Sequence, residues 1–166
     1  NGLFDAGTKL VDISQQFLKI ISRTFFPFLS RKIDKHTLFS KIYMLFTLIV
    51  TLGLIFFAPF LIPVFFSEEF SESIKVLRLM AISGVFLTMS NIYGTNYLII
   101  IGRERSLRNL TMYASLLGFV IAIPLIYYGG YMGAVAIIVF VRMLLGVGSY
   151  LLAYNCKKNI CKKNLL

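Results

Sequence analysis

Long stretches without a charged side chain divide most of this chain into helices of membrane-spanning length. Residues 42–66, 79–102 and 109–141 contain no Asp, Glu, Lys or Arg. A helix needs about 20 apolar residues to cross the hydrocarbon core of a bilayer. The third stretch is too long for one helix, so a helical hairpin turning at Gly129–Gly133 is expected there. Period-two alternation, which marks a transmembrane barrel, is absent, and the pattern therefore predicts an all-α membrane protein.

The first thirty residues differ, because polar side chains recur there at spacings of three and four. This spacing places them along one face of a helix. The face carries Asp5, Lys9, Asp12, Gln16, Lys19 and Arg23, and it is widened by Thr8, Gln15 and Ser22. Pro27 and the basic segment that follows it are expected to end this helix.

Together these patterns predict five spans with their loops alternating in charge. The expected spans are about 3–29, 42–66, 76–101, 109–128 and 132–154, followed by a basic tail over 155–166. One set of ends carries Arg31, Lys32, Lys35, Lys41, Arg103, Arg105, Arg108, Lys157, Lys158, Lys162 and Lys163. The other set carries Glu68, Glu69 and Glu72, with only Lys75 and Arg78 as cations. The positive-inside rule then predicts a cytoplasmic C-terminus.

Composition supports the membrane assignment and excludes other classes. Hydrophobic residues make up 58% of the 166 residues and charged residues 14%, whereas soluble domains are roughly 25% charged. The net charge of +10 could indicate nucleic acid, but the basic segments lack interleaved aromatic residues, so no nucleic-acid partner is expected. Cys156 and Cys161 lie in the lysine-rich tail with no His nearby, which predicts free thiols and no metal site.

The polar face of the first helix has two interpretations. A spanning helix would turn this face toward a water-filled cavity, since intramembrane charges nearly always face a bundle interior. A helix lying flat on the membrane is the alternative, although such helices usually have a uniformly basic polar face. Here Asp5 and Asp12 flank Lys9 and can neutralise it, which favours the cavity. Lys19 and Arg23 would form a positive region suited to an anionic headgroup.

Three further polar residues lie within predicted spans. Asn91 and Asn96 are costly in a bilayer unless they bind a neighbouring helix or a ligand, and both readings stay open. Arg142 lies near the middle of the last span, where it could snorkel or pair with Asp5 or Asp12. His36 falls in a basic loop, and no catalytic Ser/His/Asp or Cys/His set can be assembled around it.

Short motifs in a fixed order resemble those of the lipid-linked oligosaccharide flippases. The resemblance rests on Phe4-x-Ala6-x-x-Lys9-Leu10, Phe26–Arg31, Ile62–Phe70, Ser73–Arg78, Asn91, Gly94, Gly102-Arg103, Pro124 and the Gly129–Gly133 turn. Ser67 stands where the family more often has Gly. The chain is most similar to Wzx-type O-antigen flippases of the multidrug/oligosaccharidyl-lipid/polysaccharide exporter superfamily.

The resemblance implies that this chain is most of the C-terminal lobe of a MATE-like flippase in the bacterial inner membrane. Because it begins with Asn1, we expect it to be a piece of a longer protein. The implied function is translocation of an undecaprenyl-pyrophosphate-linked oligosaccharide by alternating access, coupled to Na⁺ or H⁺, without cofactor or enzymatic activity. Substrate-contacting residues would be Lys9, Gln16, Lys19, Arg23, Asn91 and Asn96, with Asp5, Asp12 and Arg142 serving charge pairing or ion coupling.

Other functions remain as alternatives. A multidrug or lipid II exporter of the same superfamily would carry similar helices. A membrane enzyme of polysaccharide assembly, such as an O-antigen polymerase or a glycosyltransferase, would need a sizeable loop for its chemistry, and the loops here are short. Other polysaccharide-assembly membrane proteins are expected partners, besides the bilayer and the lipid-linked glycan.

Overall fold

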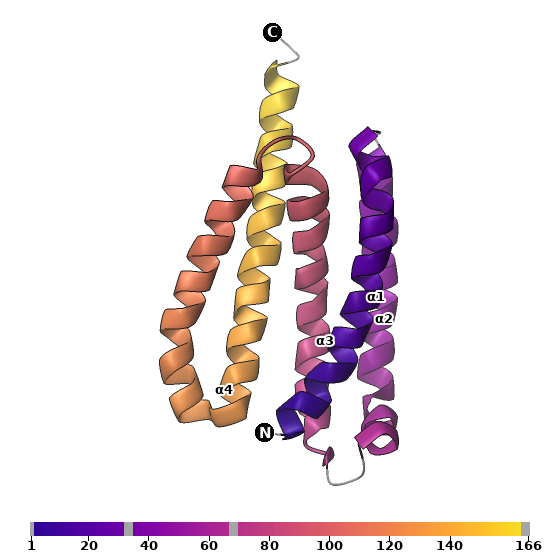
Figure 1. Cartoon of the computed structure of the whole chain (residues 1–166), viewed down its shortest axis with the longest axis vertical. Coiled ribbons are helices and arrows are strands. Elements are labelled where there is room, and N and C mark those ends of the chain that lie inside the picture. The colour runs from indigo at the N-terminus through magenta and orange to yellow at the C-terminus, as the bar shows by residue number, and fades with distance from the viewer. Residues whose placement is uncertain (1, 32–34, 67–69, 164–166) are drawn as a thin grey trace.

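A computed structural model describes residues 2–31, 35–66 and 70–163 of the chain, in which consecutive helices run antiparallel (Figure 1). The chain begins with α1 (Gly2–Arg31) and returns through α2 (His36–Phe66). It then forms α3 (Ser73–Met89), which continues directly into the π-helix η3 (Ser90–Leu98), and ends in α4 (Glu104–Lys163). These ranges contain no β-strand, so the all-helical prediction is confirmed for them.

The long helix α4 folds back on itself at Gly130. This residue has φ of 54° and ψ of −133°, which separates α4 into two antiparallel limbs. Glycine has no Cβ and adopts positive φ without steric cost, so the reversal needs this residue type. The limbs also touch closely beyond the turn, where a Cβ on Gly133 would collide with the Leu125 carbonyl. The predicted turn within Gly129–Gly133 is therefore confirmed.

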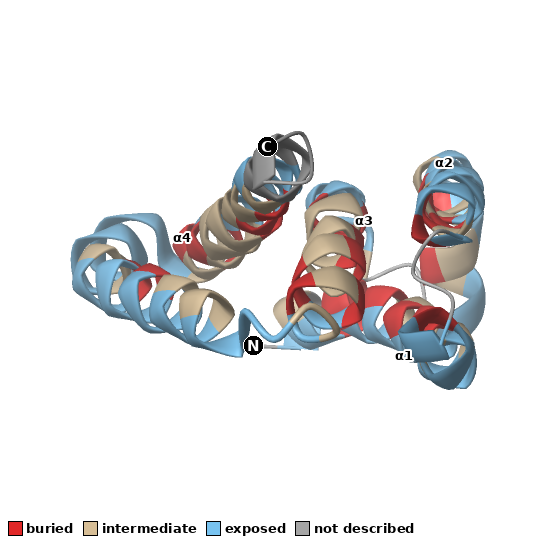
Figure 2. Cartoon of the chain, turned by 90° about the horizontal axis from the view of Figure 1, so that it is seen from above, coloured by how far each residue is buried: buried red, intermediate tan, exposed pale blue. Residues whose placement is uncertain are grey.

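The middle helix, α3, holds the other helices together. Its side chains contact α1, α2 and α4, and Figure 2 shows most of its circumference buried or half-buried. The main core joins all four helices through Val11, Ala58, Ile62, Val76, Leu77, Met80, Ala81 and Val135. Close approach of α3 and α4 depends on Gly146, because a Cβ there would lie 2.5 Å from the Phe86 carbonyl oxygen.

Much of the outer surface is apolar, as expected where helices face lipid. Three segments are long and apolar enough to cross a membrane: His36–Phe66, Ser73–Leu98 and Glu104–Lys157, the last of which contains both limbs of α4. Large side chains such as Phe56, Phe60 and Phe119 project outward from them. The chain is thus part of a multi-pass membrane protein. Helix α1 is not among the three segments, and its crossing of the bilayer stays a prediction.

Two local expectations about helix ends are wrong. Pro27 does not end α1, because the helix continues through it to Arg31. His36 does not lie in a loop, because it opens α2 and is buried against η3. The segments with Lys32, Glu68 and Glu69 lie outside the described residues, as do the side chains of Lys158, Cys161, Lys162 and Lys163.

Candidate functional site

The polar face of α1 is divided between packed and open positions. Its charged and longer members are exposed: Asp5, Lys9, Asp12, Gln16, Lys19 and Arg23. The three residues that were expected only to widen the face, Thr8, Gln15 and Ser22, are instead buried. On this face, helix α1 therefore packs through uncharged side chains and leaves a row of charges outside the helix bundle. We call Lys9, Lys19 and Arg23 the α1 cation row.

A buried glutamine shows how α1 fits against α3. The side chain of Gln15 occupies the space above Gly84, where a Cβ would collide with Gln15 Nε2. The Gln15 side-chain oxygen is buried and has no hydrogen-bond partner among the described residues. An unsatisfied buried carbonyl costs about 1–3 kcal/mol, so this oxygen is a polar group available to a donor.

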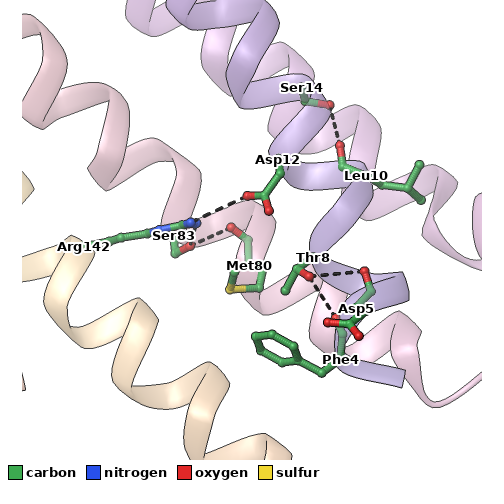
Figure 3. Close-up of polar contacts among 9 residues, drawn as sticks. All are labelled: Phe4, Asp5, Thr8, Leu10, Asp12, Ser14, Met80, Ser83 and Arg142. Atoms are coloured by element: carbon green, nitrogen blue, oxygen red, sulfur yellow. Dashed lines mark hydrogen bonds and ion pairs between the residues drawn. The ribbon is translucent and has the colours of Figure 1, made fainter. Parts of the chain in front are cut away.

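An ion pair joins the first and last helices (Figure 3). Arg142 Nη2 on the second limb of α4 lies 3.8 Å from Asp12 Oδ1 on α1. Arg142 Nη1 donates to Ser83 Oγ on α3 at 2.9 Å, and Ser83 Oγ donates in turn to the Met80 carbonyl at 2.7 Å. The arginine side chain is 18% exposed and the aspartate 53%. Of the two acids considered as its partner, the structure brings Asp12 to Arg142, whereas Asp5 forms no ion pair with a described residue.

The two asparagines of the second apolar stretch lie in η3 and differ in their surroundings. Asn96 is buried and donates from Nδ2 to Ser22 Oγ at 2.7 Å, an inter-helix hydrogen bond to α1. Asn91 is half-buried, and its Nδ2 is buried without a hydrogen-bond partner in the described part of the chain. Of the two interpretations, Asn96 therefore has the one in which the amide bonds to a neighbouring helix. The Asn91 amide can still donate a hydrogen bond to a ligand.

His36 anchors the π-helix, a role that the sequence did not indicate. Its Nε2 lies 3.1 Å from the Ile92 carbonyl oxygen, and because a carbonyl only accepts, Nε2 carries the proton. π-helical segments are rare and occur frequently at functional sites. The His36 ring also packs against Tyr97, with 4.9 Å between ring centroids.

Around His36 lies a cavity of about 610 Å³ that we call the tyrosine pocket. Its lining includes His36, Tyr93, Tyr97, Tyr150, Tyr154 and Lys157. The aromatic rings form a continuous series, with Tyr93 and Tyr150 edge to face at a centroid distance of 5.0 Å. The available sequence signal was the repeated spacing of four between tyrosines, in η3 and again in the last helix. A second, largely apolar groove of about 470 Å³ lies between α1 and α2, beside Phe25, Phe28 and Lys35.

Comparison with known proteins finds a sequence relative that is named as a transporter. The chain is 30% identical over 148 residues to a Shigella dysenteriae protein named "Putative O-antigen transporter". The resemblance to O-antigen flippases is confirmed. The match covers 86% of this chain but 37% of the relative, so the chain spans little more than a third of that relative's length. No protein-family profile matches the chain, and no solved structure matches it.

Proposed function

We propose that this protein translocates an undecaprenyl-pyrophosphate-linked O-antigen unit across the bacterial inner membrane. The observation that carries the proposal is the α1 cation row, which stays outside the packed core while lying alongside apolar helices. A cation at the bilayer centre costs at least about 2.5–3.5 kcal/mol when it faces lipid. The row therefore needs a polar surface opposite it, which a second lobe and an anionic substrate would supply.

The exposed polar side chains of α1 have roles that follow from their positions along the helix. Lys19 and Arg23 lie toward the basic end and make the first contacts with the diphosphate. Lys9 holds the diphosphate further along, near the level of the Asp12–Arg142 pair. Gln16 on α1 and Asn91 in η3 offer amides to the sugar hydroxyls, and Asn96 joins them when its bond to Ser22 opens.

The Asp12–Arg142 pair is our candidate for conformational and ion coupling, with Asp5 as a second acid on the same face. The pair links α1 directly to α4, and Arg142 is also held by Ser83 of α3, so breaking the pair removes a polar tie between α1 and the rest of the lobe. A half-exposed carboxylate can bind H⁺ or Na⁺ when the arginine leaves. Alternating access would then follow from exchange between the arginine and the ion at Asp12.

The orientation completes the proposal. The basic end, with the loop after η3 and the C-terminal end of α4, faces the cytoplasm, and the turn at Gly130 faces the periplasm. Substrate enters from the basic end, where α1 carries Lys19 and Arg23, and leaves toward the Gly130 end.

Deletion of the gene in its own strain tests the proposed function. We expect loss of surface O-antigen and accumulation of lipid-linked units facing the cytoplasm, both reversed by the intact gene. A polymerase defect would instead leave single O-antigen units on the surface. Normal O-antigen in the deletion strain would overturn the proposal, as would unchanged O-antigen with altered drug resistance or peptidoglycan synthesis.

A further inference from the structure

The tyrosine pocket is separate from the α1 cation row. Its lining comes from α2, η3 and the second limb of α4, and none of the residues that line it belongs to α1. Seen from above, α1 lies along one side of α3, whereas α2 and the C-terminal end of α4 extend toward the other side (Figure 2). A ligand in this pocket would therefore not contact the residues assigned to transport.

The chemistry of the pocket suits an anion. Lys157 supplies a cation, and Thr37, Tyr93, Tyr150 and Tyr154 carry hydroxyl groups that can donate to phosphate oxygens. The residues that line it include no Asp or Glu. A lipophilic cation would be repelled by Lys157 and would find no carboxylate, even though aromatic rings alone can bind such ligands.

The position of the pocket suits a ligand that is polar at one end and apolar at the other. Lys157 is the first charged residue after Arg142 along the second limb of α4, and a lysine that follows a long apolar stretch can extend its ammonium group to the membrane surface. Exposed apolar side chains, Val147 and Leu151 among them, lead from the pocket along α4 toward the bilayer interior. Basic pockets between transmembrane helices at the cytoplasmic surface bind anionic lipid headgroups.

We propose that the tyrosine pocket binds the phosphate headgroup of an anionic phospholipid from the surrounding leaflet. A volume of about 610 Å³ falls within the range of about 300–1,000 Å³ found for small-molecule sites. His36 couples the pocket to the π-helix, because its ring lines the pocket while Nε2 donates to the Ile92 carbonyl. The bound lipid thus stabilises the π-helical form of η3, in which Asn96 reaches Ser22.

Native mass spectrometry of the complete protein in mild detergent, titrated with phosphatidylglycerol, tests this site. We expect the wild type to bind one phosphatidylglycerol more tightly than phosphatidylcholine. Lys157→Gln should weaken phosphatidylglycerol binding about tenfold, the size expected for one charge-assisted hydrogen bond. Lys157→Arg should keep the affinity, and Arg105→Gln, which removes an exposed cation at the same end but outside the pocket, should leave it unchanged.

Competing ligands identify the source of the phosphate. Phosphatidylglycerol bound to the wild type should resist displacement by millimolar inorganic phosphate and by an equal concentration of farnesyl diphosphate. Displacement by inorganic phosphate would show a soluble-anion site, and preferential binding of farnesyl diphosphate would assign the pocket to the transported lipid. Either result overturns the proposal, as does equal weakening in Lys157→Gln and Arg105→Gln.

Discussion

Asp12 and Arg142 form an ion pair, with 3.8 Å between Asp12 Oδ1 and Arg142 Nη2, and the other guanidinium nitrogen, Nη1, donates to the buried hydroxyl of Ser83. Ser83 is oriented by its own bond to the Met80 carbonyl, so α3 presents a fixed acceptor to the guanidinium. The arginine of α4 is therefore held by α3 in the position from which it reaches the carboxylate on α1.

Exchange of the two charges tests this link. Arg142→Glu places two carboxylates beside each other, and we expect it to abolish O-antigen export. The purified protein should lose about 1–3 kcal/mol of unfolding free energy, the lower part of the range if water screens Asp12. The double variant that combines Asp12→Arg with Arg142→Asp should restore part of the O-antigen export and part of the unfolding free energy. The control is Lys75→Glu, which replaces an exposed cation at the end opposite the basic segments. It should change neither O-antigen export nor the unfolding free energy.

Charge reversal at Lys9 tests the α1 cation row. Lys9→Glu should abolish O-antigen export because a carboxylate repels the diphosphate, while membrane insertion and melting temperature stay at wild-type values. The side chain is exposed and outside the helix packing, so a folding defect is not expected. Immunoblotting for surface O-antigen and for the inserted protein measures the two properties separately. Normal export by Lys9→Glu would favour a surface-lying α1.

The buried bond between Asn96 and Ser22 predicts a stability effect. Ser22→Ala leaves Asn96 Nδ2 buried without its acceptor, which should cost about 1–3 kcal/mol of unfolding free energy. Ser30→Ala on the same helix is the matched control, since the Ser30 hydroxyl is exposed and bonds to the nearby Pro27 carbonyl. Thermal unfolding in detergent should show a lower midpoint for Ser22→Ala alone.

Two glycines with opposite surroundings provide a test of helix packing. Gly146→Ala should destabilise the protein by about 1–3 kcal/mol, because the new Cβ would meet the Phe86 carbonyl and push α3 from α4. Gly53→Ala should be neutral or stabilising by roughly 0.5–1 kcal/mol, because nothing lies within 4 Å of its Cβ position and alanine favours helix. Equal effects of the two substitutions on the unfolding midpoint would contradict the packing.

Accessibility of single cysteines tests the orientation. After Cys156 and Cys161 are replaced by Ser, Tyr128→Cys beside the Gly130 turn should react with an impermeant maleimide in intact cells. Tyr128 is 86% exposed, so the new thiol is accessible. Arg105→Cys at the basic end should react only after the membrane is opened. The reverse pattern would invert the proposed direction of transport.

The helices could be predicted because the absence of charge over long stretches is a direct consequence of lipid as solvent. The turn at Gly130 followed from the same argument, since a single helix of that length does not match a bilayer. The division of the α1 polar face could not be predicted. Periodicity places Gln15 and Gln16 on one side of the helix, but only the shape of α3 at Gly84 decides which of them is buried.

The pairing of Arg142 was foreseeable and its geometry was not. The sequence left Arg142 either to extend toward the membrane surface or to pair with Asp5 or Asp12, and only the packed helices show that it lies beside Asp12 and Ser83. The basic neighbours of His36 predict a loop at this position. No local pattern in the sequence shows that its side chain bonds to the Ile92 carbonyl of a distant π-helix.

The π-helical register of η3 has a consequence for sequence change in this region. Its hydrogen bonds run from residue i to i+5, as in the bond from the Ile99 amide to the Gly94 carbonyl, so each turn holds about one residue more than an α-helical turn. Removing one residue from this segment would let its wide turn close as an α-helix and would leave the helix after it in nearly its present orientation, because the π-helical turn holds the surplus residue. Length changes of one residue therefore have unequal consequences along this span: a deletion within Ser90–Leu98 is absorbed locally, whereas the same deletion within Ser73–Met89 rotates everything after it by about 100°.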